Sequence, residues 1–329
     1  MNQKNYFCNE LYRLAAFFFP MVENLLQILN DKSPSQFKKI HLNFNELGED
    51  YQKELKGFLD KFIPFWESLG MEFHEVVDAF LNLCNQYMYY QVRFQKNRKY
   101  PFYENPEATL KKINELYKDK KEMKRYMAGL SLSLVLWKNH YLISGFFGDC
   151  LKRHNAEINN YLEVGVGHGF YFSEALSFLN SGARKTAVDL SPVSIELTKK
   201  TVNFFHPNVL FEAIEMDFLQ FSGQKGVWDF ITMGEVLEHV QTPGLFFQKA
   251  HDLLSDEGKL FFSTCVNCPI LDHLYHFRNV EEIRSLVNDA GFSIESEQII
   301  PAENLPMEEI VRDQITINYA ALINKKEVL

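Results

Sequence analysis

Two different hydrophobic periodicities divide the chain. In residues 1–155 the apolar side chains recur at the spacing of amphipathic helices, and strand patterns are few. Beyond residue 156, short apolar runs alternate with helical patterns, which is typical of a parallel sheet with helices on both faces. The pattern therefore predicts an all-helical domain at residues 1–155, followed by an α/β domain at residues 156–329.

Helical spacing in the first half predicts five helices, at about residues 5–29, 47–69, 73–93, 106–116 and 121–152. Pro20 and Pro64 are expected to kink or split the first two helices, because proline removes a helical hydrogen bond. The run Ser33-Pro34-Ser35 predicts a break between these two helices. A second break is expected at residues 99–106, where two prolines occur.

In the second half, an apolar strand from Tyr161 runs directly into three glycines at alternate positions, Gly165, Gly167 and Gly169. Glycine is needed where the backbone takes a positive φ or where a ligand approaches without a Cβ in the way. A dinucleotide fold has the spacing Gly-x-Gly-x-x-Gly, and here the third glycine comes one residue early. An acid, Glu163, stands two residues before the first glycine. The run predicts a turn that binds a nucleotide cofactor.

The sequence Glu163-x-Gly165-x-Gly167-x-Gly169 resembles motif I of class I S-adenosylmethionine-dependent methyltransferases. Further motifs follow in the order of that family. They are a strand at 185–189 that ends in an acid, a strand at 209–213 followed by Glu215-Met216-Asp217, a strand at 228–233 followed by Glu-Val-Leu-Glu-His at 235–239, and a turn at 254–258 before a strand at 259–263. The resemblance covers about residues 158–325.

This resemblance implies a Rossmann-like, seven-stranded methyltransferase sheet, closed by an antiparallel pair of strands at 292–299 and 315–323. It also implies S-adenosyl-L-methionine as the cofactor. The residues assigned to cofactor binding are Glu163, Gly165, Gly167, Gly169, Asp189, Leu190, Met216, Asp217 and Glu235. Two of these acids have simpler alternatives, because Asp189 could cap the helix that begins at Ser191-Pro192 and Asp217 could be a solvated loop acid.

Methyl transfer from a sulfonium requires alignment of the acceptor and removal of its proton. Histidine titrates near neutral pH, so the candidate bases are His239, His273 and His140. His168, inside the glycine turn, is expected to pack beside the cofactor. Candidate substrate contacts come from the segment before the cofactor domain and from the loop at 267–277, and they are Tyr126, Trp137, Tyr141 and His276. Aromatic residues at helical spacing also form cores or dimer interfaces, so a homodimer is an open alternative.

A metal-assisted mechanism is a second hypothesis. Glu235, Glu238 and His239 resemble the metal-binding Glu-x-x-Glu-His of some ubiquinone-pathway O-methyltransferases and of small-RNA 2′-O-methyltransferases, and His273 would complete the site. A divalent ion such as Mg²⁺ would hold two adjacent oxygens of a diol, a catechol or a ribose. The same run also occurs in family members that bind no metal.

The pair Cys265-x-x-Cys268 has the spacing of redox or zinc sites, but it has no second pair and does not open a helix, so a structural role is favoured.

Charge is unevenly distributed and limits the partners. The net charge is −9; residues 1–155 carry 22 basic against 18 acidic residues, and residues 156–329 carry 12 against 25. An acidic cofactor half argues against nucleic acid as the partner, although a short basic run lies at 93–99.

No apolar run reaches the ~20 residues that a membrane helix needs, and no signal peptide is recognisable at the N-terminus. Five cysteines without a framework spacing fit reduced thiols. These features favour a cytoplasmic protein with no membrane contact.

The sequence as a whole predicts an S-adenosylmethionine-dependent methyltransferase that acts on a small aromatic or apolar molecule, by O-methylation with a histidine base. The alternatives are a metal-assisted O-methyltransferase for a diol, catechol or RNA 2′-hydroxyl, and a non-catalytic scaffold that keeps the cofactor fold. The acceptor itself is not identified by the sequence, because substrate choice depends on the site rather than on the fold.

Overall fold

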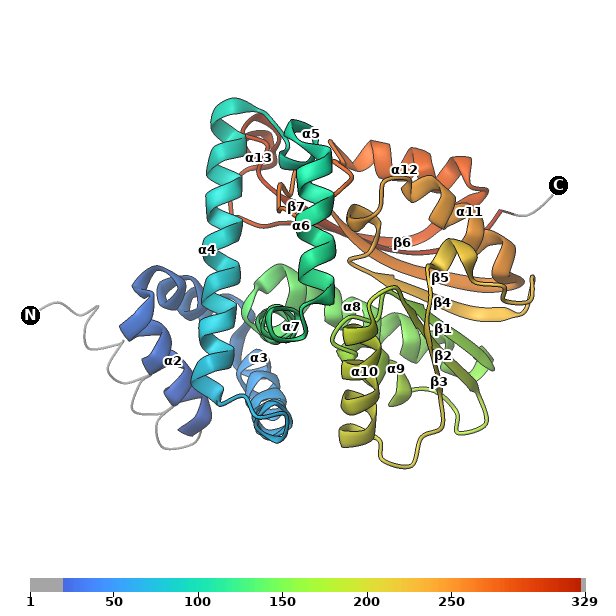
Figure 1. Cartoon of the computed structure of the whole chain (residues 1–329), viewed down its shortest axis with the longest axis horizontal. Helices are drawn as coiled ribbons and strands as arrows, with labels where there is room; N and C mark the ends of the chain where they lie inside the picture. Colours follow the sequence, from blue (N-terminus) through green and yellow to red (C-terminus); the bar gives the residue numbers. More distant parts are fainter. Residues whose placement is uncertain (1–19, 327–329) are drawn as a thin grey trace, which may run out of the picture.

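The computed structural model describes residues 20–326, with helices gathered at the N-terminal side and a sheet at the C-terminal side (Figure 1). The first part of the helix expected at 5–29, the aromatic run Phe17 to Phe19 and Cys8 lie outside the described residues. The predicted succession of helices and then alternating strands and helices is confirmed for the described residues.

The N-terminal helices pack around one buried core, which Val193 and Leu197 of the second half also join. Large buried side chains in it include Leu55, Trp66 and Phe80. The predicted breaks at Ser33 and after residue 98 are both present. The helices are α2 (Pro20–Lys32), α3 (Pro34–Ser68), α4 (Phe73–Asn97), α5 (Pro101–Glu104), α6 (Pro106–Lys118) and α7 (Lys120–Leu136).

Three of the expected features of these helices are wrong. The helix expected at 47–69 begins at Pro34. Pro64 lies inside α3 without ending it, and the irregular backbone is instead at Gly48 (φ 77°). Pro64 lies on the exposed side of the helix, where it removes one backbone hydrogen bond. The helix expected at 121–152 is two helices, because Trp137 has an extended backbone (φ −90°, ψ 121°) between α7 and α8 (Lys138–His154). The Trp137 ring packs against Phe80, a tertiary contact that helical spacing does not reveal.

The second half contains a seven-stranded sheet in the order β3-β2-β1-β4-β5-β7-β6. The first five strands are parallel, and β7 is antiparallel to both of its neighbours, as the resemblance implied. β3 begins three residues later than expected, and β5 already begins inside the predicted turn at 254–258. The strands are β1 (Asn160–Val164), β2 (Arg184–Asp189), β3 (Glu212–Glu215), β4 (Trp228–Gly234), β5 (Leu254–Val266), β6 (Phe292–Pro301) and β7 (Ile317–Lys325).

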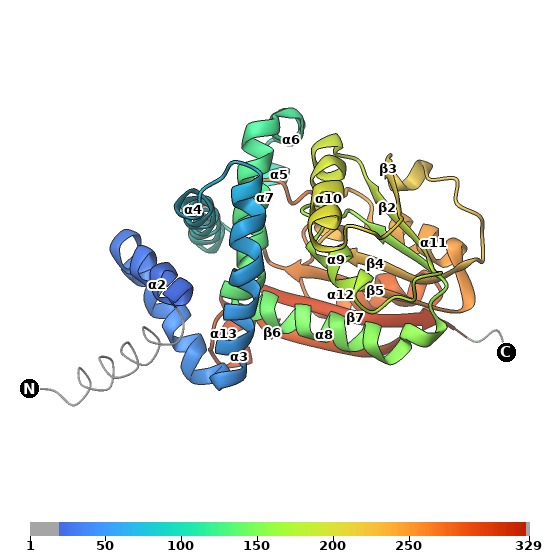
Figure 2. The same cartoon turned by 90° about the horizontal axis from the view of Figure 1, so that it is seen from below.

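Helices cover both faces of the sheet (Figure 2). Tyr161 and Phe230 share a buried cluster with α8, α9 (Phe170–Leu176) and α10 (Pro192–Phe205). Their chain neighbours Leu162 and Ile231 belong to the opposite cluster, with α11 (Pro243–Leu253) and α12 (Val280–Asp289). This alternation follows from the two-residue period of a strand. The carboxyl ends of the parallel strands therefore meet at one edge, where α/β sheets bind ligands.

The structure also has four short elements that complete the described chain. They are the 3₁₀ turns η1 (Asn155–Glu157), η2 (Phe218–Gln220) and η3 (Leu237–His239), and the helix α13 (Met307–Arg312). Among the described residues, no helix is long and apolar enough to cross a membrane.

Candidate functional site

A cavity of about 440 Å³ lies at the carboxyl edge of the sheet and is lined from both halves of the chain. One end is formed by the glycine turn after β1 and by the ends of β2 and β3. The other end is formed by α4, α7, the end of β5 and the loop at 267–277. Cavities of this size are typical of sites for small molecules and cofactors.

The glycine turn has the backbone that its sequence predicts. Gly165, Gly167 and Gly169 all have positive φ angles, of 71°, 51° and 75°. Gly165 also lies against Val236, because a Cβ at this position would come within 2.5 Å of Val236 Cγ2. The turn thus needs glycine for its conformation, and at Gly165 for space as well.

Asp189 ends β2 and is held by the glycine turn. Its Oδ2 accepts a hydrogen bond from the Gly167 amide (3.0 Å), and its Oδ1 accepts one from the Ser191 amide (2.7 Å). Burial raises the pKa of Asp189 to about 6. The helix α10 is capped by the Ser191 side chain instead, which excludes the simple capping role for Asp189. Asp189 and Leu190 both line the cavity, as expected for cofactor contacts.

Two other predicted cofactor acids also line the cavity. Glu163 is buried, accepts a hydrogen bond from the Tyr161 hydroxyl (2.6 Å), and has its pKa raised by burial to about 8. Asp217 accepts a hydrogen bond from the Leu219 amide and caps the turn η2, next to Met216. One carboxylate oxygen of Asp217 is already used to cap η2, so the contact of Asp217 with adenine stays a prediction.

The acids of the Glu-Val-Leu-Glu-His run lie deeper in the wall. Glu235 has a positive φ (51°), and its amide donates to the Ser263 hydroxyl. Glu238 is fully buried and accepts a hydrogen bond from Thr264 Oγ1 (2.7 Å). In each acid the Oε1 atom is buried and has no hydrogen-bond partner within the described part of the chain. Burial raises the pKa of both carboxyls.

Two histidines stand side by side near these acids, with the rings of His239 and His273 4.8 Å apart. Nδ1 of His239 lies 3.0 Å from the Asp272 carbonyl oxygen. A carbonyl only accepts, so Nδ1 carries the proton and Nε2 is the basic nitrogen. Burial lowers the pKa of His239, which keeps the ring neutral.

His273 differs from His239 in charge. Burial opposes its protonation, but the neighbouring Cys268 and Asp272 outweigh that effect and raise the pKa of His273 to about 10. Such a histidine already carries its second proton near neutral pH, so in this arrangement it is unsuited to be a base. The pKa of the Cys268 thiol is lowered to about 5, by a hydrogen bond from Cys265 and by His273.

Asp272 is a site residue that the sequence analysis missed. It accepts a hydrogen bond from the Tyr126 hydroxyl (2.9 Å), and its Oδ2 lies 3.6 Å from Nδ1 of His239. Although burial acts against it, His239 and His273 hold the pKa of Asp272 below its usual value. The sequence signal that could have revealed Asp272 is its position directly before the candidate base His273, in a loop at the ligand-binding edge of the sheet.

The remaining candidates divide into two groups. Tyr126, Trp137 and His140 line the cavity, and burial lowers the pKa of His140 to about 4. Tyr141 instead donates a hydrogen bond to Glu54, and His276 stacks on Tyr100 at 4.4 Å. Neither is part of the cavity lining, so neither is proposed as a substrate contact. His168 lines the cavity beside the glycine turn, as expected.

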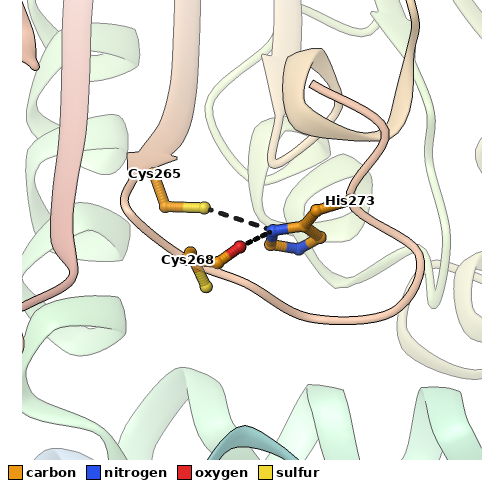
Figure 3. A group of neighbouring side chains, drawn as sticks. All are labelled: Cys265, Cys268 and His273. Atoms are coloured by element: carbon orange, nitrogen blue, oxygen red, sulfur yellow. Dashed lines mark hydrogen bonds between the residues drawn. The ribbon is translucent and has the colours of Figure 1, made fainter. Parts of the chain in front are cut away.

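The four predicted metal ligands do not form one compact set in the described residues. Glu238, His239 and His273 offer ligand atoms within 4.8 Å of one another, and so do Glu235, Glu238 and Cys265. A third group joins Cys265 and Cys268 to His273 (Figure 3). The residues that could hold a metal ion are thus divided among three overlapping groups, and thiols that the magnesium hypothesis left out are among them.

Residues 137–297 match a family model described as a methyltransferase domain. This segment contains the glycine turn, Asp189 and the Glu-Val-Leu-Glu-His run in their predicted places. It is a class I S-adenosylmethionine-dependent methyltransferase domain. The match begins at Trp137, so α8 belongs to the matched segment as well as packing on the sheet.

Among curated proteins, the chain is similar to ubiquinone biosynthesis O-methyltransferases. The similarity to the protein of Coxiella burnetii is 33% identity over 126 residues, which is 38% of this chain and 51% of the relative. For the protein of Nitrosococcus oceani it is 27% over 191 residues, or 50% of this chain and 77% of the relative. The chain therefore spans about half the length of the first relative.

Among solved structures, the chain is similar to Burkholderia thailandensis 1,6-didemethyltoxoflavin-N1-methyltransferase, a structure with 1,6-didemethyltoxoflavin and S-adenosylhomocysteine bound. The TM-score is 0.48 at 16% identity, over 70% of this chain and 92% of the other. A likeness at this level carries no argument about substrate.

Proposed function

We propose that this protein transfers the methyl group of S-adenosylmethionine to a hydroxyl oxygen of a small, largely apolar or aromatic acceptor. The observation that carries the proposal is His239, a neutral histidine on the cavity wall whose Nε2 is left basic by the Nδ1 contact to Asp272. The names of the curated relatives, which are O-methyltransferases, support the choice of oxygen.

The cofactor would bind at the end of the cavity formed by the glycine turn. Asp189 is suited to the ribose hydroxyls, because it is anchored by two backbone amides at the end of β2. Met216 and Asp217 lie at the end of β3, where the adenine would pack. S-adenosylmethionine supplies an activated methyl sulfonium, so the protein has to align the acceptor and remove a proton.

The acceptor would bind at the other end, against the helical part. The cavity wall there is apolar and aromatic, with Leu83 and Tyr87 from α4, Tyr117 from α6, and Met123, Tyr126 and Leu130 from α7. These side chains favour an acceptor with an aromatic or aliphatic body. We assign residues 20–136, which form α2 to α7, the role of a lid that shapes this pocket.

His239 would remove the proton of the acceptor hydroxyl. Asp272 orients the ring through its backbone carbonyl, and its carboxylate stabilises the imidazolium that forms. Tyr126 holds that carboxylate in place. A positioned base contributes about 10²–10⁴-fold to the rate.

The test uses the purified full chain with labelled S-adenosylmethionine and a panel of phenols, catechols and amines. We expect label transfer to a hydroxyl, and a loss of about 10²–10⁴-fold in kcat for His239→Gln with unchanged cofactor affinity. His251→Gln is the matched control, because His251 lies on α11 outside the cavity lining. Transfer to amines alone, or full activity of His239→Gln, would refute the base assignment.

A further inference from the structure

Three donor side chains at the acceptor end of the cavity have no role in the proposed proton transfer. Cys265 lies near the end of β5, and Cys268 and His273 lie in the loop that follows. All three are buried and all three line the cavity. Figure 3 shows Nδ1 of His273 facing the sulfur of Cys265 and the carbonyl oxygen of Cys268, while the Cys268 sulfur lies nearby without pointing at the imidazole.

Their spacing fits the coordination of a tetrahedral ion. The ligand atoms of Cys265, Cys268 and His273 all lie within 4.8 Å of one another. The Sγ atom of Cys265 is 3.6 Å from Nδ1 of His273. In a tetrahedral zinc site with Zn–S of about 2.3 Å and Zn–N of about 2.05 Å, sulfur and nitrogen ligands lie about 3.6 Å apart. The pair is thus already separated by one edge of such a tetrahedron.

A second observation indicates that positive charge belongs here. Glu238 is fully buried beside the carboxyl group of Glu235, and among the described residues no N–H group donates to the Oε1 atom of either acid. Glu238 also offers a ligand atom within 4.8 Å of Cys265 in one group and of His273 in another. Two buried carboxyl groups this close repel each other when both are ionised, and a nearby cation lowers the cost of their ionisation.

We propose that Cys265, Cys268 and His273 bind a Zn²⁺ ion at the acceptor end of the cavity. Thiolate sulfur selects zinc over magnesium, which prefers oxygen ligands. Binding of the ion would release the proton from Nδ1 of His273 and would require the Cys268 carbonyl, now 2.8 Å from Nδ1, to turn away. Three protein ligands and one open position are typical of catalytic zinc sites.

The open position faces the cavity and would select acceptors that carry a coordinating oxygen or sulfur atom. The selection of acceptors rests on the proposed methyl transfer, whereas binding of the ion is independent of it. The inference also replaces the Mg²⁺ site expected from Glu235, Glu238, His239 and His273 with a thiolate site that keeps only His273 as a ligand.

The experiment measures metal content rather than turnover. The full chain is purified in a phosphine reductant, treated with chelator, reconstituted separately with Zn²⁺ or Mg²⁺, dialysed and measured by mass spectrometry. We expect one zinc per chain in the wild type and no retained magnesium. Cys265→Ser and Cys268→Ser should each weaken zinc binding by about tenfold or more. Cys150→Ser is the matched control, because Cys150 is a buried free thiol outside the cavity lining.

Reconstitution with Co²⁺ adds a readout of the ligands. A sulfur-to-metal charge-transfer band in the near ultraviolet is expected for the wild type and for Cys150→Ser, and a weaker band for each site variant. Wild-type protein that retains no zinc, or cysteine variants that retain it fully, would overturn the proposal. Circular dichroism of each variant checks its fold, and calorimetry with S-adenosylmethionine reports separately whether the cofactor site is intact.

Discussion

Alanine at Gly165 tests how the glycine turn is built, because the substitution has two separable costs. The first is conformational, since Gly165 has a φ of 71°. A residue with a Cβ in the left-handed region costs about 1–2 kcal/mol. The second is steric, because the new Cβ would lie 2.5 Å from Cγ2 of Val236. Overpacking of this kind costs about 1–3 kcal/mol. The expected loss in free energy of unfolding is therefore about 2–5 kcal/mol.

Two further variants separate these costs. Gly70 has nearly the same φ (73°), but a Cβ added there would have no other atom within 4 Å, so Gly70→Ala should cost only about 1–2 kcal/mol. Val236→Ala removes the clashing methyl groups. In the double variant Gly165→Ala/Val236→Ala, the steric part of about 1–3 kcal/mol should be recovered as a favourable coupling energy.

The assay is urea unfolding of the four variants and the wild type, followed by tryptophan fluorescence. Calorimetric binding of S-adenosylmethionine is measured on the same samples, and Gly165→Ala should weaken it while Gly70→Ala should not. Equal losses for Gly165→Ala and Gly70→Ala, or strictly additive effects with Val236→Ala, would show that Val236 does not confine the turn.

Three further outcomes are expected. Asp189→Ala should weaken S-adenosylmethionine binding by about 10–150-fold in calorimetry, as for a lost charged hydrogen bond of about 1.5–3 kcal/mol. The control is Asp229→Ala, which also removes an acid that accepts hydrogen bonds from two backbone amides. Asp229 lies outside the cavity lining, so this variant should leave cofactor binding unchanged. Because burial raises the pKa of Glu163 to about 8, its favourable contribution is full below the usual pKa of 4.5 and is lost as the pH rises toward 8. Relative to Glu163→Gln, the wild type should lose up to about 1.4 kcal/mol of unfolding free energy per pH unit in that window, and parallel pH curves would contradict this. Tyr126→Phe removes the hydrogen bond to Asp272 and should lower kcat by about 2–12-fold with unchanged cofactor affinity, whereas a pure loss of affinity would argue against its positioning role.

The sequence predicted the parts of the fold that depend on local signals. The alternating glycines, the acid that ends β2 and the two-residue period of the strands were sufficient to predict the glycine turn and the sheet around it. The helical part was harder, because its boundaries depend on tertiary packing. Helical spacing runs unbroken through Trp137, whereas the break there is accompanied by contacts of its ring with Phe80 and Tyr87 of α4.

The acceptor end of the site was only partly predictable for a related reason. His239 was found because it belongs to a recognisable run, but Asp272 was missed and Cys265 and Cys268 were set aside for lack of a second cysteine pair. The partner of these cysteines is a histidine five residues after Cys268. A search limited to paired cysteines does not consider a mixed set of sulfur and nitrogen donors, although one short segment supplies all three.

The two ends of the cavity are physically connected through α7. A Cβ placed on Gly167 would lie 3.5 Å from the sulfur of Met127, so this helix packs directly on the turn that is proposed to hold the cofactor. The preceding residue, Tyr126, bonds to Asp272 beside the proposed base. A displacement of α7 would therefore change the cofactor turn and the orientation of His239 together. Since α7 also contacts α4 and α10, binding of the cofactor is expected to order the acceptor pocket, and protection of α7 amides from hydrogen exchange should increase when S-adenosylmethionine is added.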